Sequence, residues 1–463
     1  MMRRNRFAPV LAGVGLGFGL FVAAASSSSA QQNWLQWRGP LANGIAPEAD
    51  PPVTWSETNH IQWKVKIPGN GSATPIIWGK KIFVQTAIPT GKKVETPVPT
   101  PPPASTETPA TNPPAGGRGG RGMPSSGKPS EFYQFAVLCL DRETGKTLWQ
   151  QVARAEVPHE GFKSGDGSFA SSSGVTDGQH LFAFFGSRGL YCYDLEGKLE
   201  WSQDLGKMRI VMGFGEGTSP ALFGDTLVVN WDNEAGSFVI AVDKNTGKQR
   251  WKVAREEKTS WATPLVVEVA GKPQVITAAT GKIRGYDLAS GAVIWECGGL
   301  TRNVIPSPVA DQETVYCMSG YSGNSLLAIR LGRTGDLAGT DAIVWSHKKN
   351  TPYVPSPLLY HGRLYFYASN NGVLSCFNAK SGSALYEAQR LEGMPNVYAS
   401  PVGAAGRVYL TGRNGVSLVL KDADQLEVLA TNRLDEKFDA SPVAVDQELF
   451  LRGQEYLYCI TGK

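Results

Sequence analysis

A short pattern recurs along the chain and constrains its fold more than any other feature. Each copy is a hydrophobic stretch that ends in a polar residue, usually Asp, followed by a turn, in the best copies Thr-Gly, and a stretch that carries Trp. The cleanest copy covers residues 241–251. Weaker copies cover residues 139–149, 191–201, 285–295 and 328–345. Recurrence at a regular spacing indicates one supersecondary unit repeated many times. The chain is therefore predicted to be a repeat protein.

A second signal, Ser-Pro or Thr-Pro followed by an apolar run, marks where each unit begins. It occurs at Thr74-Pro75, Ser219-Pro220, Thr263-Pro264, Ser307-Pro308, Ser356-Pro357, Ser400-Pro401 and Ser441-Pro442. From Pro220 to Pro442, successive copies lie 41–49 residues apart. The longer interval from Pro75 to Pro220 holds two units and an insertion, and its second unit begins at Ser173 with Gly174 in the place of Pro. The chain therefore contains eight units.

Each unit divides into short β runs separated by turn signals. In the unit that begins at Pro357, His361-Gly362 and residues 370–372 separate runs rich in β-branched and aromatic residues. Asn-Gly between such runs is a strong hairpin signal. Three strands and a fourth that carries Trp, repeated about every 40–45 residues, are typical of a propeller blade. We predict an all-β fold, an eight-bladed β-propeller of four-stranded antiparallel blades over residues 61–463.

The last unit is one strand short, and the chain offers a strand to complete it. Residues 442–460 provide three β runs before the chain stops at Lys463. Near the other end, residues 61–65 form a Trp-bearing strand with no unit before it. We predict that this N-terminal strand enters the last blade and closes the ring, because closure removes exposed sheet edges.

Six Trp residues share one position in the repeat and are predicted to pack between blades in a structural role. They are Trp63, Trp149, Trp201, Trp251, Trp295 and Trp345. A buried aromatic side chain removes roughly 150–250 Å² from water. At the usual free energy per unit of buried apolar area, each buried Trp would stabilise the fold by on the order of 4–6 kcal/mol, as an upper bound.

The N terminus resembles a secretory leader. It has a basic start, an apolar run over residues 7–25 and small residues before a cleavage point after Ala25 or Ala30. We predict a signal peptide at 1–30, an N-terminal extension at 31–60, and export to the periplasm or the extracellular space. The alternative is an uncleaved leader that anchors the chain, because an apolar run of about 19 residues can just span a bilayer.

Charge and composition bound the partners. The formal net charge is +4, and loss of the three leader Arg leaves the mature chain near +1. Such a balance gives no field that attracts nucleic acid or anionic lipid, so we expect neither partner, no stable membrane insertion after cleavage, and a monomer. Residues 88–130 are rich in Pro and Gly and are predicted to be a disordered insertion within the first blade.

The six Cys give no sign of redox or haem chemistry. Four of them, Cys139, Cys192, Cys376 and Cys459, fall at one repeat position on different blades, where a disulfide is out of reach. No C-x-x-C motif supports haem attachment or a redox dithiol. We interpret the Cys as small buried hydrophobic residues.

The pattern Ala-x-Asp-x-x-Thr-Gly-Lys-x-x-Trp at 241–251 resembles the PQQ-like repeat of quinoprotein propellers. The segment Trp-Leu-Gln-Trp-Arg-Gly-Pro at 34–40, leading through Asn43-Gly44 to Trp63, is similar to the start of exported bacterial PQQ-binding-like propellers. The resemblance covers roughly residues 33–463. It implies the fold and two classes of function.

The first class is the PQQ-dependent oxidoreductases of alcohols or sugars, which hold PQQ and Ca²⁺ over the ring centre with an Asp base. The resemblance implies, for this class, large loops, a Glu/Asn/Asp calcium set and often adjacent Cys. Here the loops are short and no Cys are adjacent. The nearest calcium candidate is residues 232–234, Asp-Asn-Glu, which a β-turn tip also explains. This class is the alternative prediction, and no catalytic residue or metal ligand is assigned.

The second class is the non-catalytic scaffold, similar to BamB-type propellers of outer-membrane assembly. Those attach by a lipid, whereas no Cys follows the leader here. We predict an exported, non-catalytic propeller without a resident cofactor, which binds protein or cell-envelope partners.

The predicted binding site is one mouth of the central channel. Residues just upstream of each Ser/Thr-Pro lead into the innermost strands and are expected to surround that mouth. The candidates are Phe169, Glu216, Trp261, Arg302, Asn303, Tyr353, Tyr398 and Asp439. Together with polar neighbours such as Lys163 and Asp166 they would form a funnel for a peptide, a sugar or a quinone. The alternative is that these side chains fill the channel by packing against one another.

Overall fold

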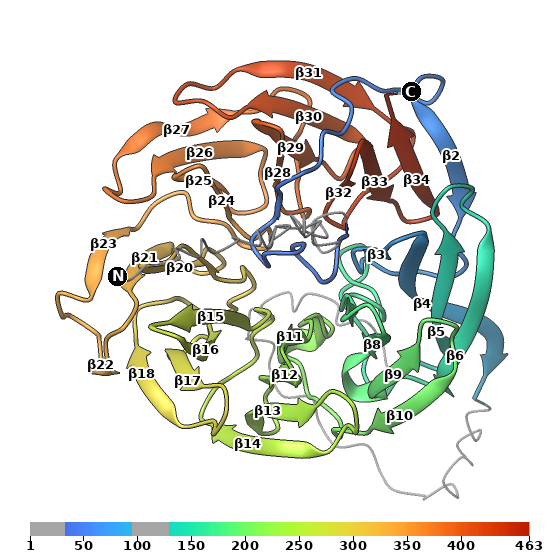
Figure 1. The fold of residues 1–463 in the computed structure, drawn as a ribbon, viewed down its shortest axis with the longest axis horizontal. Helices are drawn as coiled ribbons and strands as arrows, with labels where there is room; N and C mark the ends of the chain where they lie inside the picture. Colours follow the sequence, from blue (N-terminus) through green and yellow to red (C-terminus); the bar gives the residue numbers. More distant parts are fainter. Residues whose placement is uncertain (1–32, 95–128, 463) are drawn as a thin grey trace, which may run out of the picture.

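The computed structural model describes residues 33–94 and 129–462. Eight sheets surround a central channel, and each contributes four antiparallel strands (Figure 1). Two sheets carry a short fifth strand that pairs in parallel. The predicted eight-bladed propeller is confirmed. The predicted signal peptide at 1–30 lies outside the described residues.

The first four blades follow one another along the chain, and their strands are given from the channel outwards. Blade 1 holds β3 (Ile76–Trp78), β4 (Lys81–Lys93), β5 (Glu131–Asp141) and β6 (Thr147–Glu156). Blade 2 holds β7 (Val175–Thr176), β8 (His180–Phe184), β9 (Leu190–Asp194) and β10 (Leu199–Gln203). Blade 3 holds β11 (Ala221–Phe223), β12 (Thr226–Trp231), β13 (Ser237–Asp243) and β14 (Gln249–Arg255). Blade 4 holds β15 (Leu265–Val269), β16 (Lys272–Thr277), β17 (Ile283–Asp287), β18 (Val293–Cys297) and the added β22 (Gly335–Asp336).

The other four blades complete the ring. Blade 5 holds β19 (Val309–Ala310), β20 (Thr314–Ser319), β21 (Ser325–Arg330) and β23 (Ile343–His347). Blade 6 holds β24 (Leu358–Tyr360), β25 (Arg363–Tyr367), β26 (Val373–Asn378) and β27 (Ala384–Arg390). Blade 7 holds β28 (Val402–Ala404), β29 (Arg407–Thr411), β30 (Val416–Lys421), β31 (Val428–Arg433) and, on its channel side, β1 (Ile45–Ala46). Blade 8 holds β32 (Val443–Val445), β33 (Glu448–Arg452), β34 (Tyr456–Thr461) and β2 (Ile61–Lys66).

The two ends of the propeller meet in blade 8, as predicted. β2 pairs antiparallel with β34, with Trp63 opposite Cys459 (Figure 1). Blade 8 is also joined to blade 1 by Arg142, which lies 2.6 Å from both Asp446 and Glu448. The last strand, β34, thus pairs with β33 on one side and with the N-terminal β2 on the other. This pairing closes the seam, the place where the two ends of the propeller meet.

Trp side chains join most neighbouring blades. The indole N–H of each of five Trp donates to a backbone carbonyl in the turn of the next blade at 2.8–3.0 Å. The five are Trp63, Trp149, Trp201, Trp251 and Trp345. The Gly of that turn lies against the indole face at a positive φ, for example Gly247 against Trp201. The repeated turn with its Gly, which follows Thr in two copies, is therefore the receptor for the Trp of the blade before it.

Trp295 differs from the other five. It is buried in a cluster shared with Val315 and Leu327 of blade 5, but its N–H bonds Gln274 within its own blade at 3.2 Å. Blade 5 lacks the compact turn, because its longer connection forms β22 alongside β18. The receptor carbonyl is therefore absent from that position.

A belt of hydroxyl groups links the innermost strands. At each unit start, the Ser or Thr backbone N–H donates to the Ser or Thr hydroxyl that starts the next unit, at 2.8–3.1 Å. Seven such bonds run from Thr74 to Ser441. The belt is open only at the seam, where the Thr74 hydroxyl is buried without a partner and Arg452 instead donates to the carbonyl of Ala73 at 2.7 Å.

The described part of the N-terminal extension enters the channel. Trp34 bridges to Ile77 of blade 1, and Gln36 bridges to Val175 of blade 2. Arg38 then donates to the carbonyls of Pro401 and Pro357, both at 2.7 Å, on the opposite side of the ring. This blue segment lies near the centre of Figure 1. The extension therefore spans the channel between blades 1 and 2 and blades 6 and 7.

Two further predictions concern loops and Cys. The predicted insertion at 88–130 begins inside β4, which runs to Lys93, so its first residues belong to a strand. Residues 95–128 lie outside the described residues.

All six Cys are free and buried. Burial raises the pKa of Cys139 and of Cys376 to about 12, so these thiols are unreactive near neutral pH.

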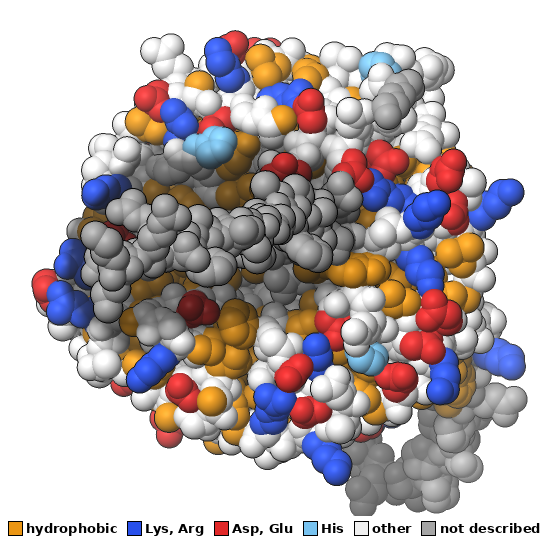
Figure 2. Space-filling view, viewed as in Figure 1, with side chains coloured by type: hydrophobic (Ala, Val, Ile, Leu, Met, Phe, Trp, Pro, Cys, Tyr) orange, Lys and Arg blue, Asp and Glu red, His pale blue; other side chains and the backbone are white. Residues whose placement is uncertain are grey.

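The outer surface mixes acidic and basic side chains on the face shown in Figure 2. Within the described ranges, no helix is long and apolar enough to cross a membrane.

The Trp receptor generates a testable prediction. Gly247 and Gly224 both have a positive φ, but a Cβ on Gly247 would lie 2.6 Å from Trp201, whereas a Cβ on Gly224 would meet nothing within 4 Å. Gly224→Ala should cost about 1 kcal/mol of unfolding free energy from backbone strain alone. Gly247→Ala should cost about 1–3 kcal/mol more, because it displaces the indole. Urea unfolding of both variants measures the difference, and equal losses would contradict the receptor role.

Candidate functional site: a cavity at the channel mouth

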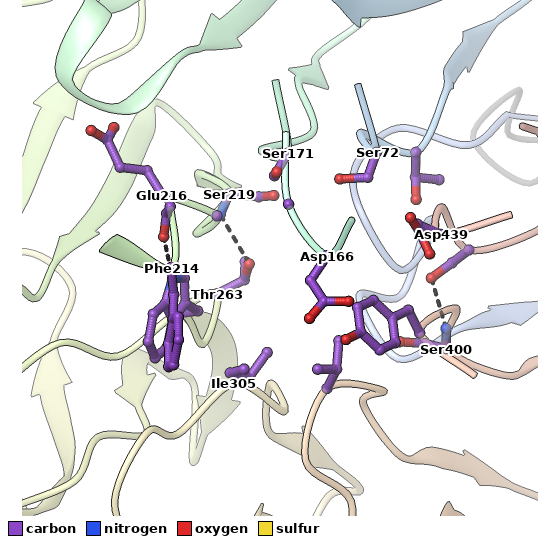
Figure 3. A pocket seen from close by; sticks show the side chains of 18 of the residues that line it. Ser72, Asp166, Ser171, Phe214, Glu216, Ser219, Thr263, Ile305, Ser400 and Asp439 are labelled. Carbon is purple, nitrogen blue, oxygen red and sulfur yellow. Dashed lines mark hydrogen bonds between the residues drawn. The ribbon is translucent and has the colours of Figure 1, made fainter. Parts of the chain in front are cut away.

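A cavity of about 190 Å³ occupies the mouth of the channel (Figure 3). Its wall combines an aromatic side, an ion-paired side and a set of hydroxyl groups from the belt. Of the eight predicted site residues, five line it: Glu216, Trp261, Tyr353, Tyr398 and Asp439. The unit starts thus bring side chains from blades far apart in sequence to one place.

The remaining three candidates lie elsewhere, which corrects the prediction of their position. Phe169 packs edge-on against Tyr133 and Phe162, with ring centroids 4.8 and 4.7 Å apart. Arg302 is exposed and bridges Ser322 by its backbone. Asn303 is buried, and its backbone N–H bonds the hydroxyl of Thr280. None of the three lines the cavity, although other residues of the same loops do, among them Gly167, Ser171 and Ile305.

Glu216 is already engaged by the protein. Its carboxylate accepts from Arg188 at 2.9 Å and from the backbone N–H of Ser187 at 2.6 Å. Figure 3 shows this carboxylate directed away from Asp166 and Ser171. The backbone and the aliphatic part of Glu216 therefore line the cavity, whereas its carboxylate is bound by Ser187 and Arg188 of blade 2.

The aromatic side of the cavity is a chain of rings. Phe214 lies 6.4 Å from Trp261 and 6.3 Å from Tyr321, and Tyr321 lies 4.8 Å from Tyr353, measured between ring centroids. The Trp261 indole donates to the carbonyl of Gly215 at 2.7 Å, which fixes its orientation. The rings therefore form a connected, rigid apolar wall.

The opposite side is held together by Arg413. Its guanidinium lies 2.5 Å from Asp439 and 3.0 Å from Asp166, and it stacks 3.8 Å from the centre of the Tyr398 ring. Lys163 is 2.5 Å from the second oxygen of Asp166. Burial alone would raise the pKa of Asp166, but the hydrogen bonds from Lys163, Arg413 and Tyr398 outweigh it and hold this pKa below its usual value.

Sequence reasoning missed Arg413, although a signal for it exists. It directly follows β29, in the turn between the second and third strands of blade 7. In a four-stranded antiparallel blade, this turn and the segment that leads into the first strand lie at the same end. The position therefore points to the same mouth as Asp439.

The inner wall carries hydroxyl groups whose protons are free. Ser219, Thr263 and Ser400 accept backbone hydrogen bonds through their oxygens. Figure 3 shows the bond from Ser219 to Thr263. Among the described residues, none accepts a hydrogen bond from these three hydroxyls in return. Thr74 also lines the cavity, and its buried hydroxyl has no partner.

The N-terminal extension provides the floor. Trp37 lines the cavity, and its neighbours Gln36 and Arg38 are tied to opposite sides of the ring. The recurring pattern gave no sign of this, because the extension belongs to no unit. The two closely spaced Trp and the Arg in residues 34–38 were the only available signal.

The predicted calcium candidate at 232–234 is used inside blade 3. Asp232 is fully buried, and its two carboxylate oxygens lie 2.9 and 3.0 Å from Arg255 nitrogens. Glu234 accepts from the backbone and the hydroxyl of Thr259. Residues 232–234 thus lie in the connection between β12 and β13, where Asp232 forms a buried ion pair. Within residues 33–94 and 129–462, no group of three or more His, Cys, Asp or Glu is arranged to hold a metal.

Residues 134–385, more than half of the chain, match the profile of the family described as outer membrane protein assembly factor BamB. The chain belongs to this family. The predicted resemblance to PQQ-like propellers of BamB type is thereby confirmed.

Three solved structures are similar to this BamB-family chain. The quinohemoprotein alcohol dehydrogenase from Comamonas testosteroni aligns with 9% identity and a TM-score of 0.60, over 94% of this chain and 81% of the dehydrogenase. BamB from Moraxella catarrhalis aligns with 17% identity and a TM-score of 0.37, over 62% of this chain and 95% of that one. The designed Ika8 protein aligns with 13% identity and a TM-score of 0.50, over 73% of this chain and 94% of that one. At these identities the dehydrogenase supports the fold alone. No curated protein matches the sequence.

The ion-paired side of the cavity predicts a pH-dependent effect. Arg413→Gln should lower the unfolding free energy at pH 7 by about 2–4 kcal/mol, because it leaves the partly buried Asp439 without its cation and Asp166 with Lys163 alone. In the native chain, the lowered pKa of Asp166 gives stability that is present above the unfolded value of about 3.9 and is lost as the pH falls through the folded value. The two proteins should therefore converge in stability below about pH 4.

The control is Arg333→Gln, which breaks an exposed pair with Asp341 and should cost at most about 1 kcal/mol. Denaturant unfolding at several pH values measures both variants. A deficit for Arg413→Gln that stays constant down to pH 2.5 would show that the loss is one of packing and not of charge pairing.

Proposed function

We propose that this protein is an exported, non-catalytic propeller that binds a component of the cell envelope in the channel-mouth cavity. The observation that carries the proposal is the cavity itself, whose wall combines rigid aromatic rings with hydroxyl groups that have free protons. Such a concave site with a few convergent polar groups is the usual form of a binding site. The BamB family, described as an outer membrane protein assembly factor, supports an envelope setting.

The carboxylates of the cavity are poor candidates for a catalytic base. A general base works best with a pKa near the operating pH. Asp166 has a lowered pKa and is paired with Lys163 and Arg413. Asp439 shares the same guanidinium. The arrangement therefore favours holding a ligand over proton transfer.

The alternative, a PQQ-dependent oxidoreductase, does not fit these residues. PQQ carries carboxylates and acts with Ca²⁺, so its site needs unpaired cations and several convergent oxygen ligands. Lys163 and Arg413 are already neutralised by Asp166 and Asp439. The described residues hold no metal-type cluster of acidic side chains. We therefore assign no step through this cofactor.

Export is part of the proposal and rests on the leader-like sequence at residues 1–30. A periplasmic or extracellular location would bring the cavity to envelope material after cleavage.

Capture from an envelope fraction tests the proposal. The full chain is immobilised, and detergent-solubilised envelope components that bind are quantified by mass spectrometry. Trp261→Ala with Tyr398→Ala should remove at least one component that the native chain retains, because both side chains line the cavity. Phe223→Ala, an exposed aromatic on β11 outside the cavity wall, should retain it.

Identical capture by the native chain and the cavity variant would show that the cavity is not the binding site. Stoichiometric uptake of PQQ with Ca²⁺, together with reduction of a dye by alcohols or sugars, would establish the oxidoreductase in place of the scaffold.

A further inference from the structure

We propose that the ligand of this cavity is the end of a neutral saccharide. The inference rests on the proposed function and names the chemical class of its ligand. Three independent features of the wall support it: charge balance, hydroxyl donors and a flat aromatic surface.

The charged groups of the cavity cancel within the protein. Arg413 pairs with Asp166 and Asp439, and Lys163 pairs with Asp166. The Glu216 carboxylate is bound by Arg188. An ionic ligand would have to break one of these pairs, and a buried charge left without its partner is costly. The electrostatics therefore favour a ligand without net charge.

The hydroxyl belt provides donors at a spacing set by the blades. Ser219, Thr263 and Ser400 belong to three different blades, and each has used its oxygen as an acceptor and kept its proton. The Thr74 hydroxyl has no hydrogen-bond partner, although the residue is only 2% exposed. A buried polar group without a partner is rare in proteins and is satisfied most simply by a ligand. Donors arranged around an arc match a ligand with several hydroxyl oxygens.

The cavity wall also carries hydrogen-bond acceptors. Asp166 and Asp439 are held in place by Arg413, and a carboxylate oxygen has room for more than one hydrogen bond. A sugar hydroxyl both donates and accepts, so it can accept a hydrogen bond from a belt hydroxyl and donate one to a carboxylate. A peptide backbone offers one donor and one acceptor per residue and matches this arrangement less well.

The aromatic wall suits the apolar face of a sugar ring. Trp261 is fixed by its bond to Gly215 and lies beside Phe214, and Tyr353 extends the surface. Pyranose rings present a face of C–H groups, which packs on an aromatic face while the hydroxyls point outward to polar partners. An acyl chain would leave the belt hydroxyls unsatisfied.

The N-terminal segment that forms the floor of the cavity limits which part of a ligand can enter. Trp37 lines the cavity, and the segment that carries it is anchored on both sides of the channel by Gln36 and Arg38. A polymer therefore cannot pass through the ring from this mouth. We infer that the cavity takes a terminal sugar unit and not the interior of a chain.

Calorimetry and Trp fluorescence with defined sugars test the inference. The probes are the methyl α- and β-glycosides of glucose, galactose, mannose and N-acetylglucosamine. At least one should bind the full chain and change the emission of Trp37 and Trp261. Charged analogues of a neutral probe that binds, with a carboxylate or an ammonium in place of a hydroxyl, should bind at least tenfold more weakly.

Two variants separate this ligand class from others. Thr74→Val removes the unpartnered hydroxyl and should weaken binding of the neutral glycoside about 3- to 10-fold. Trp261→Ala should weaken it about tenfold or more. Phe223→Ala, outside the cavity, should leave the affinity unchanged.

Binding of none of the eight glycosides, or tighter binding of the charged analogues, would overturn the saccharide proposal. If no glycoside binds but Trp261→Ala with Tyr398→Ala still loses an envelope component in the capture experiment, only the saccharide proposal fails and the proposed function stands. If no glycoside binds and this double variant retains every component, both proposals fail.

Discussion

The hydroxyl belt is the interaction on which the rest of the structure depends. The Ser or Thr at the start of a unit donates its backbone N–H to the hydroxyl of the next unit. In most units the following Pro lacks an N–H and biases the preceding residue toward extended geometry. This Ser or Thr therefore sets the spacing of neighbouring blades and ends the loop at the channel mouth. Five of the belt residues also line the cavity: Thr74, Ser219, Thr263, Ser400 and Ser441. Architecture and candidate binding site share one set of atoms.

Because the belt is not closed between Ser441 and Thr74, other interactions hold blades 8 and 1 together at the seam. Thr74 and Ser441 are not joined by a belt bond, and the contacts there come from several sources. β2 completes blade 8, and the Trp63 indole bonds the carbonyl of Arg142. Burial lowers the pKa of Arg452 to about 9, so at neutral pH it carries its charge while it donates to Ala73. At the seam, three other interactions thus take the place of the missing belt bond. They are the pairing of β2 with β34, the hydrogen bond of the Trp63 indole and the hydrogen bond of the buried Arg452 guanidinium.

The repeat allowed the architecture to be predicted from the sequence, because each unit repeats the same local contacts. Strand order, eight blades and the N-terminal strand in the last blade all follow from pattern and turn chemistry. The prediction was less complete where a contact has no equivalent in other units. Trp295 lacks its usual receptor because one connection is longer, and Trp37 reaches the cavity from a segment outside the repeat.

The candidate site was predictable in part for the same reason. The position upstream of each unit start located Trp261, Tyr353, Tyr398 and Asp439 at the mouth. It did not show which side chains of a loop face the cavity: Gly167 and Ser171 line it, whereas Phe169 between them packs against Tyr133. Nor did it show the ion pairs that cancel the charges, since Arg413, Asp166 and Asp439 come from three separate loops. Side-chain pairing between loops is set by the closed ring and has no signature in a single unit.

The most direct test of the belt compares two hydroxyl deletions by urea unfolding. Ser441→Ala removes the acceptor of the Ser400 N–H, whereas Thr74→Val removes a buried hydroxyl that has no partner. We predict that Ser441→Ala lowers the unfolding free energy by about 1–3 kcal/mol, and that Thr74→Val leaves it unchanged or raises it. Equal losses in the two variants, or a larger loss for Thr74→Val, would contradict a ring held by inter-blade hydroxyl bonds.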